Sequence, residues 1–283
     1  MIAGNTGGPD MAQDMAQGMA QGMAHRRGIG REGALWLAFY AVILAAWIVL
    51  LAMTLASDVP SGLSGELGRE IWLALCGGAQ GAGFAALAAM WALMAAAMML
   101  PTFAPALRTY LHLGATGATS AAGALLLVAG YLSVWGLAAL VGATAQLRLQ
   151  DLGMLAPDGS SLSLWLTAGL LALAGLYQLS ALKAGCLARC RMPLTFFLER
   201  WSPGPGRALR MGAELGVICL GCCWALMALA FVGGTMNLLW MLAATVFMTL
   251  EKLPDIGRVL TRPAGAVLLG AAAFVALRAA NLI

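Results

Sequence analysis

The chain has 283 residues, of which 61% are hydrophobic and only 10% are charged, and its mean hydropathy is +0.87. Soluble domains carry roughly 25% charged residues, so the 12 acidic and 16 basic side chains are too few to cover a water-soluble protein of this size. This composition excludes soluble enzymes, nucleic-acid-binding proteins and secreted disulfide scaffolds. It predicts an all-α fold, namely a polytopic bundle of transmembrane helices. The net charge of +4 is then explained by the placement of basic residues in the loops on one side of the membrane rather than by an acidic partner.

The first 34 residues differ in composition from the rest, and we expect them to form a disordered, Met-rich tail. Methionine occupies every fourth position of MAQDMAQGMAQGMAH, so that on a helix one face would carry Met11, Met15, Met19 and Met23. Thioether sulfur suits Cu(I), which makes a soft-metal arm ending near His25 the alternative. Each glycine in the repeat weakens a helix by about 1 kcal/mol relative to alanine, and this favours disorder.

Seven apolar stretches are about as long as the ~20 residues that a helix needs to cross a bilayer. They are predicted at 35–56, 83–100, 121–145, 163–182, 211–232, 235–252 and 264–281. The first is longer than the ~7–15 apolar residues of a signal peptide, so it is expected to be a retained membrane anchor. Residues 83–282 are then a six-helix membrane domain, in which the fifth and sixth spans form a tight hairpin at Gly233–Gly234.

The basic residues predict the orientation of these spans. If the seven spans alternate, 13 of the 16 lysines and arginines lie on the same side as the N-terminus. Cytoplasmic loops of membrane proteins carry such an excess of positive charge. We therefore expect a multi-pass membrane protein with a cytoplasmic N-terminus.

The run CLGCC in the middle of the fifth span is the most informative motif. At ~100° per residue, Cys219 and Cys223 share a narrow stripe of the helix with Gly212 and Gly216, and Cys222 lies beside it. Glycines allow a neighbouring helix to approach closely, so the thiols are expected to face that neighbour rather than lipid.

Methionines of other spans are expected at the same depth as these thiols. Met90 and Met94 share one face of the second span, and Met241 lies at about the same level of the sixth. Thiolate and thioether ligands select Cu(I), or zinc where thiolates dominate. The alternative is that these sulfur residues are ordinary apolar packing residues of membrane helices.

Two further thiols, Cys186 and Cys190, lie just past the inner end of the fourth span. On a continuing helix their i, i+4 spacing puts both sulfurs on one side, as a cytoplasmic relay would require. The alternative is two small apolar residues at a helix end. Cys76 stands alone and is expected to serve packing only.

Two carboxylates, Glu214 and Glu251, lie near inner ends of spans. Ionisable side chains are costly to place inside a membrane span, so their presence there suggests a functional role. Here each can reach the interface, and Glu251 is next to Lys252, so ion pairs that anchor the helix ends are equally consistent with the sequence.

At these residues the chain resembles the bacterial predicted metal-binding integral membrane proteins, a family of unknown function with a Cys-x-x-Cys-Cys-Trp motif in a transmembrane helix. The resemblance covers about residues 88–280. It is carried by WALMAAAMMLPTFAP (91–105), AGYLSVW (129–135), YQLSALKAGCLARCRMP (177–193), RMGAELGVICLGCCWALM (210–227) and GGTMNLLWM with LEKL downstream (233–253). Leu215 stands where the family often has a histidine, so one potential ligand is missing here.

The resemblance implies metal binding, and with the sulfur positions it predicts an inner-membrane protein that handles or delivers Cu(I), with zinc as the alternative metal. The expected ligands are Cys219, Cys222, Cys223, Cys186, Cys190, Met90, Met94 and Met241. The expected partners are the lipid bilayer and a copper chaperone, an exporter or a cuproenzyme assembly factor, with no nucleic acid among them. The alternatives are a scaffold or partner subunit without metal and a small-solute transporter. No enzymatic activity is expected, since the spans offer no acid–base pair.

Overall fold

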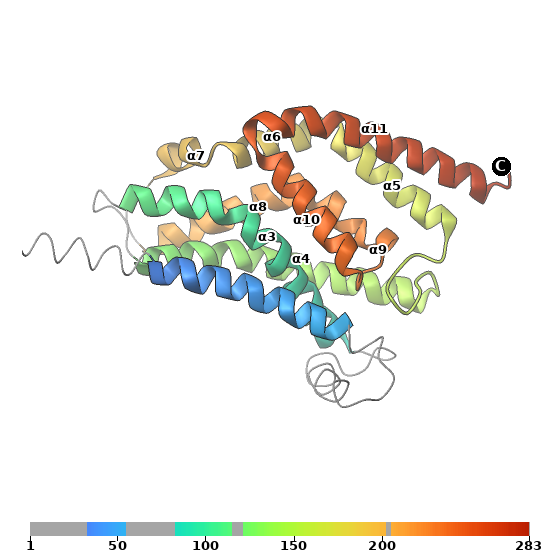
Figure 1. Cartoon of the computed structure of the whole chain (residues 1–283), viewed down its shortest axis with the longest axis horizontal. Coiled ribbons are helices and arrows are strands. Elements are labelled where there is room, and N and C mark those ends of the chain that lie inside the picture. The colour runs from blue at the N-terminus through green and yellow to red at the C-terminus, as the bar shows by residue number, and fades with distance from the viewer. Residues whose placement is uncertain (1–32, 55–82, 115–120, 202–204, 283) are drawn as a thin grey trace, which may run out of the picture. The chain divides into compact units, whose positions relative to one another are not determined.

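The structure is a computed structural model that describes residues 33–54, 83–114, 121–201 and 205–282 (Figure 1). The predicted Met-rich tail, apart from its last two residues, and the lone Cys76 lie outside the described residues. The chain divides into two compact units between Val42 and Ile43, inside the helix Gly33–Thr54. Both sites discussed below belong to the second unit.

The regular elements of the described residues are α-helices, which confirms the predicted all-α class. After the helix Gly33–Thr54 they are α3 (Phe84–Gly114), α4 (Ala121–Asp151), α5 (Leu164–Gln178), α6 (Ala181–Arg191), α7 (Pro193–Arg200), α8 (Pro205–Ala228), α9 (Ala230–Gly233), α10 (Leu238–Lys252) and α11 (Pro254–Ala279). An isolated β-bridge joins Leu155 to Ser161 in the loop before α5.

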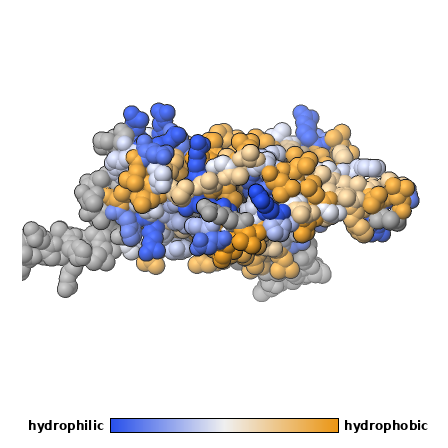
Figure 2. All heavy atoms as spheres, turned by 90° about the horizontal axis from the view of Figure 1, so that it is seen from above, coloured by the Kyte–Doolittle hydropathy of each residue, from blue (hydrophilic) through white to orange (hydrophobic). Residues whose placement is uncertain are grey.

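Five helices in the described part of the chain are long and apolar enough to cross a membrane. They are Gly33–Thr54, Phe84–Leu113, Ala122–Asp151, Gly206–Gly233 and Pro254–Ala279, and the bent pair of α5 and α6 would be a sixth. α10 has 15 residues, fewer than the ~20 of a full crossing. The predicted sixth span, 235–252, therefore stays a prediction, whereas the predicted seventh, 264–281, lies almost entirely within the apolar helix Pro254–Ala279. Figure 2 shows hydrophilic residues gathered toward one end of the visible face and hydrophobic residues over much of the rest.

The predicted fourth span is broken near its end. α5 stops at Gln178, and α6 starts at Ala181 in a direction that differs by 62°. Ser180 causes the new start, because its hydroxyl accepts a hydrogen bond from the Lys183 amide at 3.1 Å and so caps α6. After the bend α6 packs on α8, and this determines where its two cysteines lie.

α8 packs on α4 with their backbones almost in contact. A Cβ atom added at Gly212 would lie 2.0 Å from the Leu127 carbonyl oxygen, and one added at Gly130 would lie 2.0 Å from the Leu209 oxygen. Gly216 meets Val134 one helical turn further along. The close approach predicted from the glycine stripe is therefore confirmed, with α4 as the neighbour.

The paired contacts also give the relative directions of the helices. Gly212 meets Leu127 and Gly216 meets Val134, so from the first contact to the second both residue numbers increase, which makes the two helices parallel. α3 runs opposite to α4, because Trp91 packs on Gly142 while Met99 contacts Tyr131. These directions are those expected if the second, third and fifth predicted spans alternate across a membrane.

A buried polar network joins α5, α6 and α10. The Lys183 ammonium, fully buried, donates hydrogen bonds to Glu251 Oε2 at 2.8 Å and to Gln178 Oε1 at 2.5 Å. Gln178 Nε2 donates to the other oxygen of Glu251, and the Arg191 guanidinium donates to the Glu251 carbonyl oxygen at 2.8 and 3.0 Å. Glu251 thus pairs with Lys183 and not with the adjacent Lys252, because neighbouring positions on a helix point about 100° apart.

Candidate metal centre

Three thiols of α8 form a compact buried group, which we call the thiol cluster. The ligand atoms of Cys219, Cys222 and Cys223 all lie within 4.8 Å of one another, and each residue is at most 3% exposed. The i, i+3, i+4 spacing places the three side chains on adjacent positions of one helix face. The thiols of Cys222 and Cys223 both donate to the Cys219 carbonyl oxygen, at 3.0 and 2.9 Å, which directs them back along the helix.

α4 contributes a tyrosine to this cluster. Because Gly212 and Gly216 let α4 approach α8, Tyr131 reaches the cluster, and its hydroxyl lies 3.0 Å from Cys219 Sγ. The same hydroxyl donates to the Met99 carbonyl oxygen of α3 at 3.2 Å. Tyr131 therefore ties three helices together next to the sulfur atoms.

α6 brings the second pair of predicted cysteines to the same place. Cys190 Sγ lies 3.9 Å from Cys222 Sγ. Cys186 packs against Gly221, where an added Cβ atom would be 2.8 Å from its sulfur. The prediction that both sulfurs share one side of a helix fits these contacts, and that side faces α8. Cys190 thus adjoins the thiol cluster instead of being separated from it past the end of a span.

The thioether beside the cluster comes from a residue that sequence reasoning missed. The Cys223 thiol donates to Met99 Sδ of α3 at 3.7 Å. The sequence favoured Met90 and Met94, which are also buried, but five positions along a helix rotate a side chain by about 140°, so Met94 and Met99 point to different sides. Met241 on α10 is buried as well. That Met90, Met94 and Met241 are metal ligands stays a prediction.

A lysine is the second group that sequence reasoning missed. Lys252 Nζ lies 3.1 Å from Cys219 Sγ and donates to Thr102 Oγ1 at 2.7 Å. The sequence interpretation assigned this lysine to Glu251, its neighbour in the chain. The structure places the positive charge of Lys252 within hydrogen-bonding distance of a sulfur of the thiol cluster. The helical periodicity of α10 and of α8 does not indicate this contact.

The fold and this site define a helical bundle with several helices of membrane-spanning length and a buried group of thiols able to hold a metal ion. A family model described as PpoB2, a copper chaperone, matches residues 88–275, and the chain therefore belongs to this family. The match includes α6, α8, α10 and the part of α3 that carries Met99, and with them every sulfur and nitrogen atom of the site described above. Comparisons with curated proteins and with solved structures found no match.

Proposed function

We propose that the chain is a copper carrier of the bacterial inner membrane, rather than an enzyme, and that Cys219, Cys222 and Cys223 hold the ion as Cu(I). One observation carries this proposal: three buried thiols lie within 4.8 Å of one another on one helix of a copper chaperone family member. Thiolate and thioether are soft ligands, and soft ligands favour Cu(I) over harder divalent ions.

The family match and the soft ligands favour Cu(I) over zinc. Cu(I) is satisfied by two or three sulfur ligands, which the cluster supplies from a single helix, with the Met99 thioether at its edge. Structural zinc sites are closed by four ligands. Cys190 could serve as the fourth, because its sulfur is 3.9 Å from that of Cys222, close to the ~3.8 Å between two sulfurs of a tetrahedral zinc site with Zn–S distances of about 2.3 Å. Zinc therefore remains the alternative that the experiment below has to distinguish.

Transfer of the ion would proceed by exchange of one thiol for another. Cys190 is the natural next ligand, since its sulfur faces Cys222 from α6, and Cys186 lies one helical turn before it. Stepwise exchange along these sulfurs would move the ion from α8 to α6 without releasing it to water. The partner would then be a copper chaperone, an exporter or a cuproenzyme assembly factor that offers thiols or thioethers of its own.

Lys252 would balance the charge of the loaded site. With two of the three cysteines as thiolates and the third as a neutral thiol, the site with one Cu(I) carries one net negative charge, which is costly to bury unless it is paired. We expect Lys252→Leu, which adds no sulfur, to weaken Cu(I) binding by about 10- to 100-fold, the usual effect of losing a group that supports metal ligands. Lys252→Arg keeps the charge and should retain most of the affinity, as measured by competition with a coloured Cu(I) chelator. Equal affinities of Lys252→Leu and the unchanged chain would contradict this role.

Anaerobic titration of the purified full chain tests the proposal as a whole. Cu(I) and Zn(II) are added separately under reducing conditions, and bound metal is measured by elemental analysis after desalting. One tightly held Cu(I) per chain is expected, with zinc displaced by copper. A sample alkylated at its thiols before loading is the control. If the chain retains neither metal, the copper proposal is wrong and the thiols only serve helix packing. If it binds zinc more tightly than copper, zinc is the metal of the site.

A further inference from the structure

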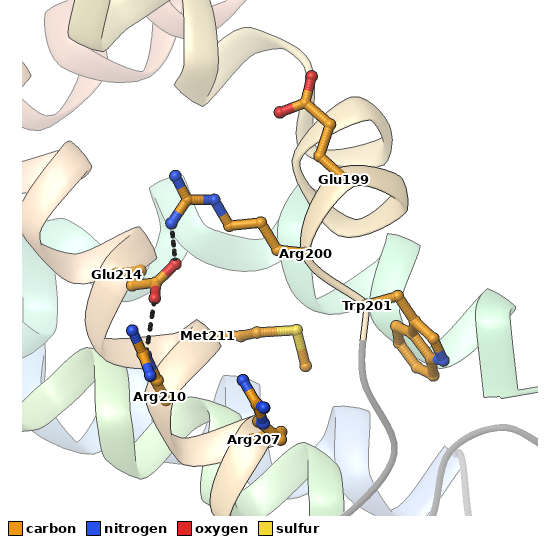
Figure 3. A pocket seen from close by; sticks show the side chains of 7 residues that line it. All are labelled: Glu199, Arg200, Trp201, Arg207, Arg210, Met211 and Glu214. Carbon is orange, nitrogen blue, oxygen red and sulfur yellow. Dashed lines mark hydrogen bonds and ion pairs between the residues drawn. The ribbon is translucent and has the colours of Figure 1, made fainter.

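A second polar site lies where α7 ends and α8 begins, apart from the thiol cluster. It is a cavity of about 340 Å³ that is lined by both helices, and Figure 3 shows the side chains around it. Arg200 and Trp201 approach from the end of α7, and Arg207, Arg210 and Glu214 from the first turns of α8. The copper proposal uses none of these residues.

Glu214 holds two of the arginines in place. Arg200 Nη1 donates to Glu214 Oε2 at 2.5 Å, and Arg210 Nε donates to Glu214 Oε1 at 3.1 Å (Figure 3). Each bond uses one of the five N–H groups of a guanidinium, so donors remain for a further acceptor. The Arg207 side chain lines the same cavity, from the same stretch of α8.

The charge of the lining indicates the charge of the ligand. Three arginines and two glutamates, Glu214 and Glu199, line the cavity, which gives a formal charge of +1. One negative charge is that of a phosphodiester group, whereas phosphomonoesters and polyphosphates carry more. The planar fork of a guanidinium also fits the paired oxygens of a phosphate group.

The position of the cavity favours a phosphodiester that belongs to a lipid. α8 belongs to the apolar segment Gly206–Gly233, which is long enough to cross a membrane, and the cavity is at its first turn. α7 buries Phe196 and Phe197 but exposes Leu194 and Leu198, which are 52% and 66% accessible. Such an apolar exposed edge is what acyl chains would cover. Tryptophan and arginine are typical of the headgroup level, where basic pockets bind anionic lipids.

We infer that this cavity binds the headgroup of an anionic phospholipid. The phosphate lies between Arg200, Arg207 and Arg210, with Glu214 holding two of them open toward it. The acyl chains lie along the exposed leucines of α7. The bound lipid would fix α7 against the start of α8 and so anchor this end of the bundle at the membrane surface.

Native mass spectrometry of the purified full chain tests this inference. Phosphatidylglycerol, phosphatidylcholine with the same acyl chains, and inorganic phosphate are the probes. We expect the chain to bind phosphatidylglycerol at least tenfold more tightly than phosphatidylcholine. The Arg200→Gln/Arg207→Gln variant should lose this preference. Arg278→Gln, which removes an exposed arginine at the far end of α11, should retain it.

Arg207→Gln alone leaves both ion pairs of Glu214 intact, so it separates lipid binding from folding, and its thermal unfolding should match that of the unchanged chain. An unchanged preference in both the single and the double variant would overturn the inference. Displacement of phosphatidylglycerol by equal concentrations of inorganic phosphate would overturn it in favour of a free anion. Tighter binding of a phosphoserine peptide would overturn it in favour of a protein partner.

Discussion

Replacing Cys219, Cys222 and Cys223 together by serine is expected to reduce bound copper from one ion per chain to the background. Serine is close to cysteine in size, so α8 should still pack on α4, but a hydroxyl is a poor ligand for Cu(I). The measurement is copper per protein by elemental analysis, after anaerobic loading and desalting. The same preparation gives the free energy of unfolding, which shows whether the variant is folded.

The control for this prediction is Cys76→Ser, which removes one thiol outside the five of α6 and α8. It should carry as much copper as the unchanged chain. If the triple serine variant is folded and also retains stoichiometric copper, the thiol cluster is not the copper site. The glycine and cysteine face of α8 would then be a packing surface alone.

The largest effect on stability is expected from Lys183→Met. The variant leaves the Glu251 carboxylate, which is 2% exposed, without its ammonium partner in the interior. Breaking a buried ion pair in this way typically costs about 3–5 kcal/mol, because an unpaired charge remains away from water. Unfolding of the detergent-solubilised chain by denaturant or heat measures the change.

Two comparisons make this prediction specific. Lys183→Met/Glu251→Met removes both charges and should recover most of the lost stability, since apolar pairs often replace buried ion pairs without loss. Arg210→Gln removes one arm of an exposed ion pair, whose arginine side chain is 70% accessible, and should cost less than about 1 kcal/mol. If Lys183→Met costs no more than Arg210→Gln, the network of α5, α6 and α10 does not hold these helices together.

This network also connects stability with the candidate site. Lys183 belongs to the helix that carries Cys186 and Cys190, and Glu251 directly precedes Lys252, which contacts Cys219. The ion pair therefore fixes α6 and the end of α10 relative to each other on two sides of the thiol cluster. Loss of the pair should weaken copper binding as well as folding.

Local features of the fold and of the site follow from the sequence alone. The length and composition of the apolar stretches determine helices, because a chain in lipid has to satisfy its backbone hydrogen bonds within each segment. The spacing of CLGCC determines that three thiols share one face of α8, because the helical repeat is the same wherever the helix lies. The glycines at 212 and 216 mark the side on which another helix approaches.

Only the tertiary structure decides which groups from other helices meet that face. Periodicity orients a side chain about its own helix axis, but it contains no information on the position of a second helix. The bend after Gln178 brings Cys190 beside Cys222, and the packing of α3 and α10 brings Met99 and Lys252 to the other thiols. These contacts depend on one break in a helix and on the packing of whole helices, which many residues determine together. No local sequence pattern can therefore predict them.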